Sequence, residues 1–99
     1  MTIEKREESM ALYDIYRELL TEKQRQYFED YYFEDLSISE IADNRSVSRN
    51  AVFDQIKRVT LILTDYERKL KWLSKTKQIS NLVMPLDLKD EIMNILKEE

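Results

Sequence analysis

The chain has 99 residues and a net charge of −4, with 42% hydrophobic and 36% charged residues, a composition that fits one small domain with a modest core. It contains no cysteine and no histidine, which excludes disulfide bonds, thiolate or imidazole metal sites, and catalysis by Ser-His or Cys-His pairs. We therefore expect no metal, no cofactor and no enzymatic activity. The chain also has no glycine and a single proline, Pro85. Because small sheets need glycine in hairpins and bulges, this favours an all-α fold.

The charge pattern indicates the kind of partner. Residues 1–44 carry 12 acidic and 5 basic side chains, residues 45–83 carry 3 and 9, and residues 84–99 carry 5 and 2. A basic block of this kind favours a polyanionic partner, RNA or DNA, although a lysine-rich solvated helix gives the same count. The charged N-terminus and the lack of a long apolar run predict no signal peptide, no membrane insertion and a cytoplasmic location.

Two helices are expected before the basic block. The first covers roughly residues 7–20, where apolar side chains recur at helical spacing: Leu12, Tyr16, Leu19 and Leu20. Thr21 and Gln24 form a capping box, which predicts a second helix through about Phe33. The face that we expect this helix to bury consists of Gln24, Tyr27, Phe28 and Tyr31. Its aromatic cluster could instead stack on unpaired bases, but the acidic surroundings favour core packing.

Residues 37–58 have the pattern of a helix-turn-helix. Ser37 and Glu40 form a capping box for a short first helix, and Ser48 can cap a second one. The second helix would dock through Val52, Ile56 and Val59 and present its outer face to a major groove. Asp54 lies on this outer face among the predicted nucleic-acid-binding residues, which are Arg45, Ser48, Arg49, Asn50, Phe53, Lys57 and Arg58.

An apolar seam continues beyond the motif. Spacings of four and three residues join Val52, Ile56, Val59, Leu63, Tyr66, Leu70 and Leu73. This heptad pattern predicts one long recognition helix with an extension over residues 48–74. The extension must bury its stripe against the C-terminal segment or against a second copy. We favour a homodimer, with five packing residues: Val59, Leu63, Tyr66, Leu70 and Leu73.

The rest of the chain is expected to form a C-terminal helical segment over residues 75–99. Pro85 interrupts it, and Asp87 is the expected N-cap of a short last helix that packs on the long one. Its apolar stripe consists of Leu88, Ile92, Ile95 and Leu96. The predicted organisation is thus a single domain over residues 1–99, with the N-terminal helices and the first helix of the motif in 7–47.

The span from Leu19 to Lys57 resembles region 4 of bacterial sigma factors. Residues 1–73 more narrowly resemble the YlxM-like family, in the segments IEK, LYDIYRELLTEKQ, SRNAVFDQIKR and LTDYERKL. That family comprises small helix-turn-helix-like bacterial proteins whose genes neighbour those of the signal recognition particle GTPases. The resemblance implies a role in, or regulation of, the signal recognition particle pathway, through particle RNA, the particle GTPase or its receptor.

The chain departs from the family pattern at the turn. Ser46 stands where glycine is usual, which implies either a left-handed residue at a steric cost or a turn of altered geometry. Arg45 stands at a usually apolar position, which implies either looser docking of the helix or a cation turned outward.

Two functions follow from these observations. The first is a regulatory protein of the signal recognition particle pathway, and the second is a DNA-binding transcription regulator that uses Ser48–Arg58 as recognition helix. Arg49, Asn50 and Lys57 suit base and phosphate contacts in DNA. Phe53 and Asp54 suit them poorly, because phosphates repel an acid, and an exposed aromatic ring stacks more readily on an unpaired base or fits a protein pocket. Packing of Phe53 under a dimer partner or the C-terminal helix is the structural alternative.

Overall fold

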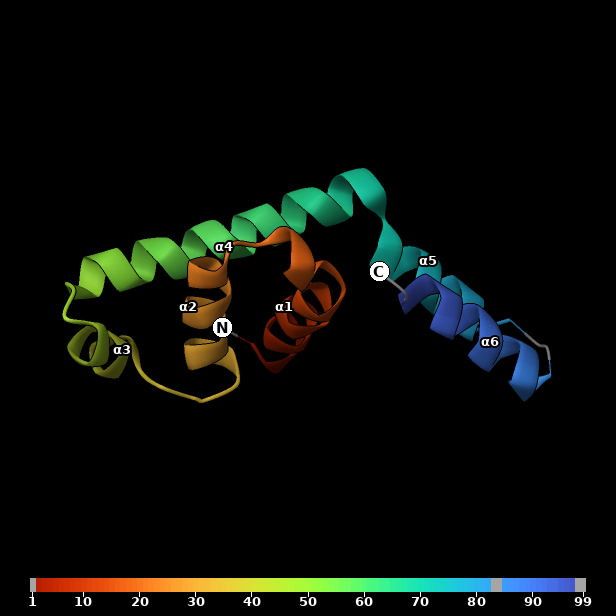
Figure 1. Cartoon of the computed structure of the whole chain (residues 1–99), viewed down its shortest axis with the longest axis horizontal. Helices are drawn as coiled ribbons and strands as arrows, with labels where there is room; N and C mark the ends of the chain where they lie inside the picture. Colours follow the sequence, from red (N-terminus) through yellow and green to blue (C-terminus); the bar gives the residue numbers. More distant parts are fainter. Residues whose placement is uncertain (1, 83–84, 98–99) are drawn as a thin grey trace.

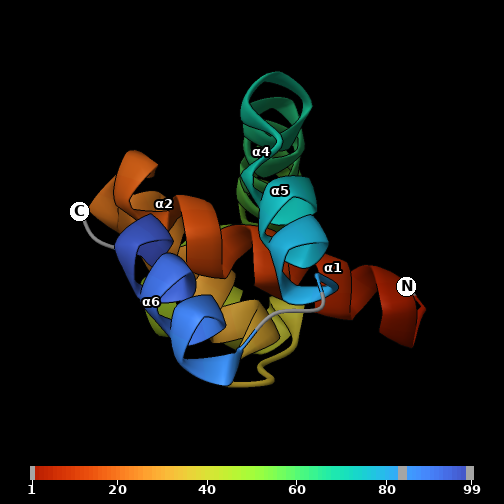
Figure 2. The same cartoon turned by 90° about the vertical axis from the view of Figure 1, so that its right-hand side faces the viewer.

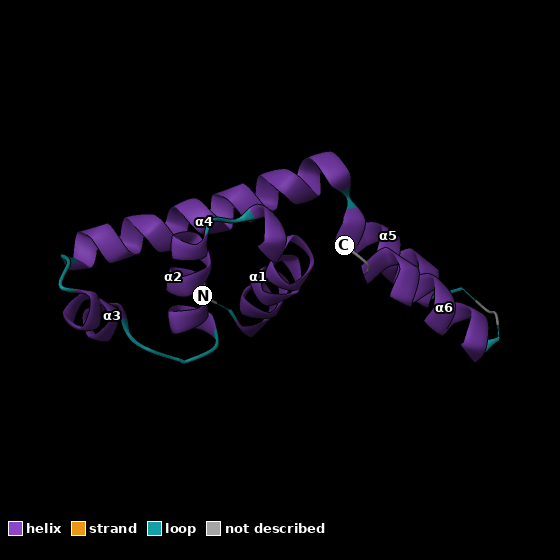
Figure 3. Cartoon of the chain, viewed as in Figure 1, coloured by secondary structure: helices purple, strands orange, loops and turns teal. Residues whose placement is uncertain are grey.

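The computed structural model describes residues 2–82 and 85–97. Within them the chain forms α-helices and one short 3-10 helix, with no strand, as the composition predicts (Figure 3). The elements are α1 (Ile3–Tyr16), the 3-10 helix η1 (Arg17–Leu19), α2 (Glu22–Tyr32), α3 (Ile38–Arg45), α4 (Arg49–Leu70), α5 (Trp72–Ser80) and α6 (Leu86–Lys97).

Helix α4 organises the molecule. It lies across α1, α2 and α3, which all pack against one of its sides, while α5 and α6 form a hairpin beyond its C-terminal end (Figure 1). Viewed along the long axis, this hairpin lies in front of the rest of the chain (Figure 2). The molecule is therefore elongated, measuring 51 × 25 × 21 Å.

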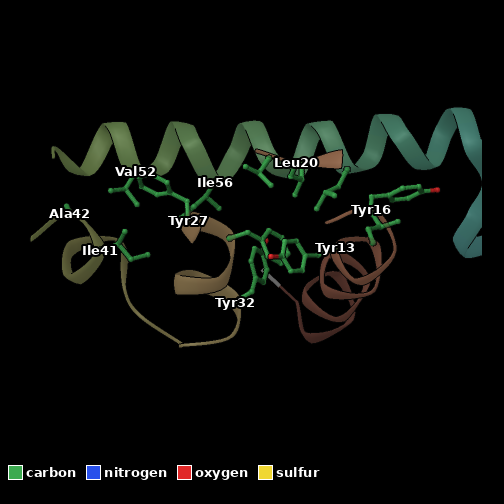
Figure 4. Packing of buried hydrophobic residues seen from close by; sticks show 13 residues of the cluster. Tyr13, Tyr16, Leu20, Tyr27, Tyr32, Ile41, Ala42, Val52 and Ile56 are labelled. Atoms are coloured by element: carbon green, nitrogen blue, oxygen red, sulfur yellow. The ribbon is translucent and has the colours of Figure 1, made fainter. Parts of the chain in front are cut away.

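The core lies between α4 and the first three helices (Figure 4). Val52, Ile56, Val59 and Leu63 are the residues that α4 buries, and burial of each such side chain contributes roughly 1.5–3 kcal/mol before entropic costs. The α1 and α2 helices contribute stacked rings, with the Tyr13 and Phe28 centroids 4.4 Å apart. The remaining core residues are Leu12, Tyr16, Leu20, Tyr27, Tyr32, Ile41 and Ala42.

Helices α1 and α2 differ in detail from the expectation. α1 begins at Ile3, because the Thr2 hydroxyl caps it by accepting a hydrogen bond from the Lys5 amide at 3.2 Å. It ends at Tyr16, where the chain tightens into η1. The capping box of α2 is present, but Tyr32 takes the buried place expected for Tyr31. Tyr31 and Gln24 are only half-buried.

The long helix ends earlier than the heptad pattern predicts. Lys71 adopts the left-handed conformation with φ 56° and ψ 30°, so α4 stops at Leu70 and α5 begins in a new direction. The Glu67 carboxylate caps α5, accepting hydrogen bonds from the Leu73 amide at 3.0 Å and the Ser74 amide at 3.2 Å. The prediction of one helix over residues 48–74 was therefore wrong in its last four residues, because a side chain from the preceding turn of α4 stabilises a break.

The seam residues occupy three different environments. Val59 and Leu63 are buried against the chain's own first helices. Tyr66 and Leu73 are half-buried, and Leu70 is exposed. The seam is therefore covered within the chain as far as Leu63, and a second copy could reach only its C-terminal part.

The last helix is a partner of α5. Helix α6 packs against α5, and α5 turns away from the axis of α4 (Figure 1). Asp87, expected as the N-cap, lies in the first turn of α6 because the helix begins at Leu86, two residues before the start that an N-cap at Asp87 would give. A carboxylate in a first turn still favours the helix through its dipole.

Candidate nucleic-acid interface

The turn of the motif is a Schellman-type helix end. Ser46 has φ 56° and ψ 45°, the left-handed conformation that glycine adopts most easily. The Val47 amide donates to the Ala42 carbonyl at 3.1 Å, and the Ser46 amide donates to the Asp43 carbonyl at 3.4 Å. Of the two alternatives for this position, the chain therefore adopts the left-handed turn, and two hydrogen bonds offset its steric cost.

Capping interactions fix both helices of the motif. The Ser37 hydroxyl and the Glu40 carboxylate form the predicted box at the start of α3, each with a hydrogen bond of 3.1 Å. The Ser48 hydroxyl accepts a hydrogen bond from the Ala51 amide at 3.1 Å and starts α4. Because Ser48 is exposed and its amide lies at the helix N-terminus, this end of α4 favours an anion through unpaired backbone donors and the helix dipole.

Arg45 docks α3 on α2. Its Nε and Nη2 atoms lie 2.9 and 2.7 Å from Asp30 Oδ2, and Nη1 donates to Gln26 Oε1 at 3.3 Å. Its guanidinium also lies 4.9 Å from the centre of the Tyr27 ring. These contacts occupy the cation, so the structure separates Arg45 from the other residues predicted to bind nucleic acid. The sequence suggested either looser docking of the helix or a cation turned outward. Neither alternative included the ion pair with Asp30, which lies fifteen residues earlier.

The outer face of α4 is exposed and polar. Arg49, Asn50, Asp54, Lys57 and Arg58 are all exposed. None of them has a side-chain hydrogen bond or an ion pair to another part of the described chain. The structure thus leaves these residues of the segment 48–58 accessible on the part of the α4 surface that the core does not cover.

Phe53 belongs to the same surface. Phe53 is 53% exposed, so neither the core nor the C-terminal helix covers its side chain. At about 100° per residue, Arg49, Phe53 and Lys57 lie along one flank of α4, four residues apart, and Arg58 lies on the opposite flank. An exposed ring between two cations is an arrangement that can stack on a base while its neighbours meet phosphates.

Several other cations of the described chain are engaged in the fold. Arg6 donates to the carbonyls of Tyr31 and Tyr32 at 3.1 and 3.0 Å. Arg68 and Lys69 pair with Asp65 at 2.6 and 3.0 Å, and these two hydrogen bonds hold the pKa of the Asp65 carboxyl below its usual range. Among the described residues, the cations on the outer face of α4 have no such partner, so they are available to an external anion.

A shallow groove adjoins Arg58. It has a volume of about 540 Å³ and lies between the start of α2 and the middle of α4. Leu61 is 60% exposed at its edge. Leu61 and Ile62 both lie off the heptad seam, so α4 is apolar on more than one side. The groove is lined by Leu19, Thr21, Gln24, Arg58, Leu61, Ile62, Asp65 and Tyr66.

The capped helices, the tight turn and the exposed second helix define a helix-turn-helix protein. The chain belongs to the family described as "Putative helix-turn-helix protein, YlxM / p13 like", whose match spans residues 3–99. None of the helices in the described part of the chain is long and apolar enough to cross a bilayer.

Bacterial relatives share much of this sequence. A UPF0122 protein of Fusobacterium nucleatum is 49% identical over 80 residues, which cover 81% of this chain and 76% of the relative. A UPF0122 protein of Shouchella clausii is 49% identical over 75 residues, or 76% and 69% of the two chains. One from Bacillus cereus strain AH187 is 46% identical over 84 residues, or 85% and 76%.

Proposed function

We propose that this chain is a non-enzymatic regulatory protein of the cytoplasm that binds nucleic acid through the outer face of α4. The observation that carries the proposal is the set of three exposed cations, Arg49, Lys57 and Arg58, none of which has a partner within the described chain. Unpaired cations on one face neutralise phosphates and release counterions, which is the main source of affinity for nucleic acids. Ser48 and Asn50 add polar groups at the N-terminal end of the same face.

The exposed ring favours RNA with unpaired bases as the ligand. Phe53 projects between Arg49 and Lys57, and a phenyl ring has no hydrogen-bonding group with which to read a base pair in a groove. It can stack on a base that is splayed out of a loop or bulge. Asp54 also disfavours deep entry into a duplex groove, because the flanking phosphates would repel its carboxylate.

The family to which the chain belongs supports the proposed pathway. YlxM-like proteins are associated by gene neighbourhood with the signal recognition particle GTPases, and we propose that this chain acts in the same pathway. Its ligands there would be the particle RNA and the particle GTPase or its receptor. The shallow groove beside Arg58, whose lining includes the apolar residues Leu19, Leu61 and Ile62, supports a protein contact next to the RNA-binding face.

A DNA-binding transcription regulator is the second candidate. The specific observation in its favour is the turn geometry, because Ser48–Arg58 stands as an exposed second helix directly after a capped, left-handed turn. Arg49, Asn50 and Lys57 would then contact base edges and phosphates of one major groove.

Capture from cytoplasm, with and without nuclease, separates these functions. The tagged full chain is expected to retain particle RNA, and treatment with ribonuclease should release it together with any protein held only through RNA. Recovery of the particle GTPase after ribonuclease treatment would mark a direct protein contact. Enrichment of specific DNA that only deoxyribonuclease releases would support the transcription regulator and contradict the RNA proposal.

We also propose that the chain acts as a homodimer. Two copies would present two basic α4 faces at once, so the affinity for a folded RNA or a two-part DNA site would rise through effective concentration. Support comes from apolar surface that the single chain leaves exposed, namely Leu70, Leu88 and Ile95.

A further inference from the structure

The hairpin of α5 and α6 contains no buried residue among those that the structure describes. Helices of 9 and 12 residues are marginal in water unless tertiary packing covers their apolar sides. One end of the hairpin is anchored, where the Tyr16 hydroxyl accepts a hydrogen bond from the Trp72 amide at 3.1 Å. The remainder extends beyond the main body (Figures 1 and 2) and leaves apolar side chains exposed, among them Leu88 and Ile95.

The uncovered surface is apolar and continuous across both helices. A groove of about 450 Å³ runs between them, lined by Trp72, Lys75, Gln78, Ile79, Leu82 and Leu96. On α6, Leu88 is 46% exposed and Ile95 is 61% exposed. These two residues are seven positions apart, so they lie on one side of the helix, two turns from each other.

Leu88 and Ile95 lie on the same face of the hairpin as the groove. The side of α6 that faces α5 is marked by Met93, whose sulfur lies 3.9 Å from the Ser80 hydroxyl. At about 100° per residue, Ile95 and Met93 fall on opposite flanks of Leu96, which lines the groove. The groove and the Leu88–Ile95 pair therefore form one apolar face.

Charges of opposite sign border this face on the two helices. The α5 helix contributes Lys75 at the groove and has no acidic residue. The α6 helix exposes Glu91 beside Leu88 and Ile95. No ion pair in the described residues joins α5 to α6, and the Lys89 ammonium donates instead to the Ser80 carbonyl at 3.0 Å. Lys75 and Glu91 are thus exposed charges of opposite sign that no ion pair within the described residues neutralises.

We propose that a second copy of the chain covers this face, so that two α5–α6 hairpins pair about a two-fold axis into a four-helix bundle. In a two-fold interface each contact occurs twice, so Lys75 of each copy would meet Glu91 of the other while the apolar grooves close on each other. A nucleic acid would be repelled by the acidic residues of α6. This inference rests on the homodimer in the proposed function and moves its interface from the α4 seam to the hairpin.

Sedimentation equilibrium of the full chain, without nucleic acid, tests the interface. The expected mass at micromolar concentration is twice the 12.0 kDa of one chain. The double variant Leu88→Glu/Ile95→Glu should sediment as one chain while circular dichroism shows that α1 to α4 remain folded. Leu61→Glu is the matched control, because Leu61 is 60% exposed but lies on α4, and it should remain dimeric. A dimer lost in the control and kept in the double variant would overturn the proposal.

A charge exchange tests the two-fold pairing directly. Lys75→Glu and Glu91→Lys should each weaken dimerisation at least tenfold, because like charges then face each other twice. An equimolar mixture of these two variants should form a mixed dimer at the parent affinity, because every contact again joins opposite charges. A parent chain that stays monomeric, or variants that fail to pair when mixed, would overturn the inference. Salt-dependent RNA binding by such a monomer would leave the proposed function standing.

Discussion

The hydroxyl of Tyr16, at the end of α1, donates a 2.8 Å hydrogen bond to Oε1 of Glu67 in α4. That carboxylate also accepts hydrogen bonds from the amides of Leu73 and Ser74. The contact therefore joins the core to the break between α4 and α5. It determines where the long helix stops and in which direction the C-terminal hairpin leaves the body.

Glu67→Ala should loosen this junction. Removal of the carboxylate leaves two amides of α5 without their cap, so the free energy of unfolding should fall by about 1–2 kcal/mol in urea denaturation. Glu18→Ala is the control, because Glu18 has only a 3.8 Å exposed contact with Arg17, and the effect there should stay below about 0.5 kcal/mol. Equal losses in the two variants would contradict the role of Glu67 as a cap.

The stability of the fold should fall in alkaline solution. Burial, followed by the hydrogen bond to Glu67, raises the pKa of Tyr16 from 10.0 to about 12, and burial with a hydrogen bond to Glu29 raises that of Tyr13 as well. The folded state therefore holds protons that the unfolded state has already lost between pH 10 and 12, so the stabilisation is complete below pH 10 and declines through that window. Urea unfolding at several pH values should show a shallower decline for Tyr16→Phe than for the parent, and identical slopes would contradict this assignment.

Ser46→Gly should stabilise the chain. A residue with a Cβ atom at φ 56° carries a steric cost of roughly 1 kcal/mol that glycine avoids, less the greater chain entropy of glycine when unfolded. A net gain of up to about 1 kcal/mol is expected in thermal or urea unfolding. Ser39→Gly, within the right-handed part of α3, should have the opposite sign. Destabilisation of both variants would show that Ser46 contributes more than its backbone conformation.

Phe53→Ala should separate binding from folding. Because the ring is 53% exposed, its loss should change the free energy of unfolding by less than about 0.5 kcal/mol. Affinity for an RNA hairpin with an unpaired loop should fall by about 1–3 kcal/mol, as expected for a lost stacking contact. Affinity for a fully paired duplex should barely change. If Phe53→Ala lowers the free energy of unfolding by more than it weakens the free energy of RNA binding, the ring serves the fold and not the binding site.

Much of the fold could be predicted because its signals are local. Both capping boxes lie within four consecutive residues, and the buried stripe from Val52 to Leu63 follows the period of a single helix. The left-handed turn at Ser46 was one of two alternatives that the family pattern left open, because glycine is usual at that position. The outer face of α4 followed from the same period, since residues opposite a buried stripe are exposed.

The features that the sequence did not reveal depend on distant contacts. The Glu67 carboxylate that caps α5 after the break at Lys71 accepts a hydrogen bond from Tyr16, which lies 51 residues before it. Without it the heptad spacing through Leu73 reads as one helix. Arg45 was predicted to bind nucleic acid because its positive charge can be read from the sequence. Its ion pair with Asp30 cannot, because Asp30 belongs to another helix. Glycine is usual at left-handed positions. Because the chain has no glycine, the residue type at position 71 did not indicate the left-handed conformation of Lys71.

The salt dependence of RNA binding by Arg49→Ala/Arg58→Ala tests the central claim most directly. The control is Lys5→Ala/Lys23→Ala, which removes the same charge from exposed positions in α1 and α2. Fluorescence anisotropy between about 50 and 200 mM salt should show weaker binding for the α4 variant and a log–log slope that is shallower by about 1.4, roughly 0.7 for each lost contact with single-stranded RNA. The control should keep the parent slope. A parent protein whose affinity does not depend on salt, or an α4 variant that behaves like the control, would contradict the account.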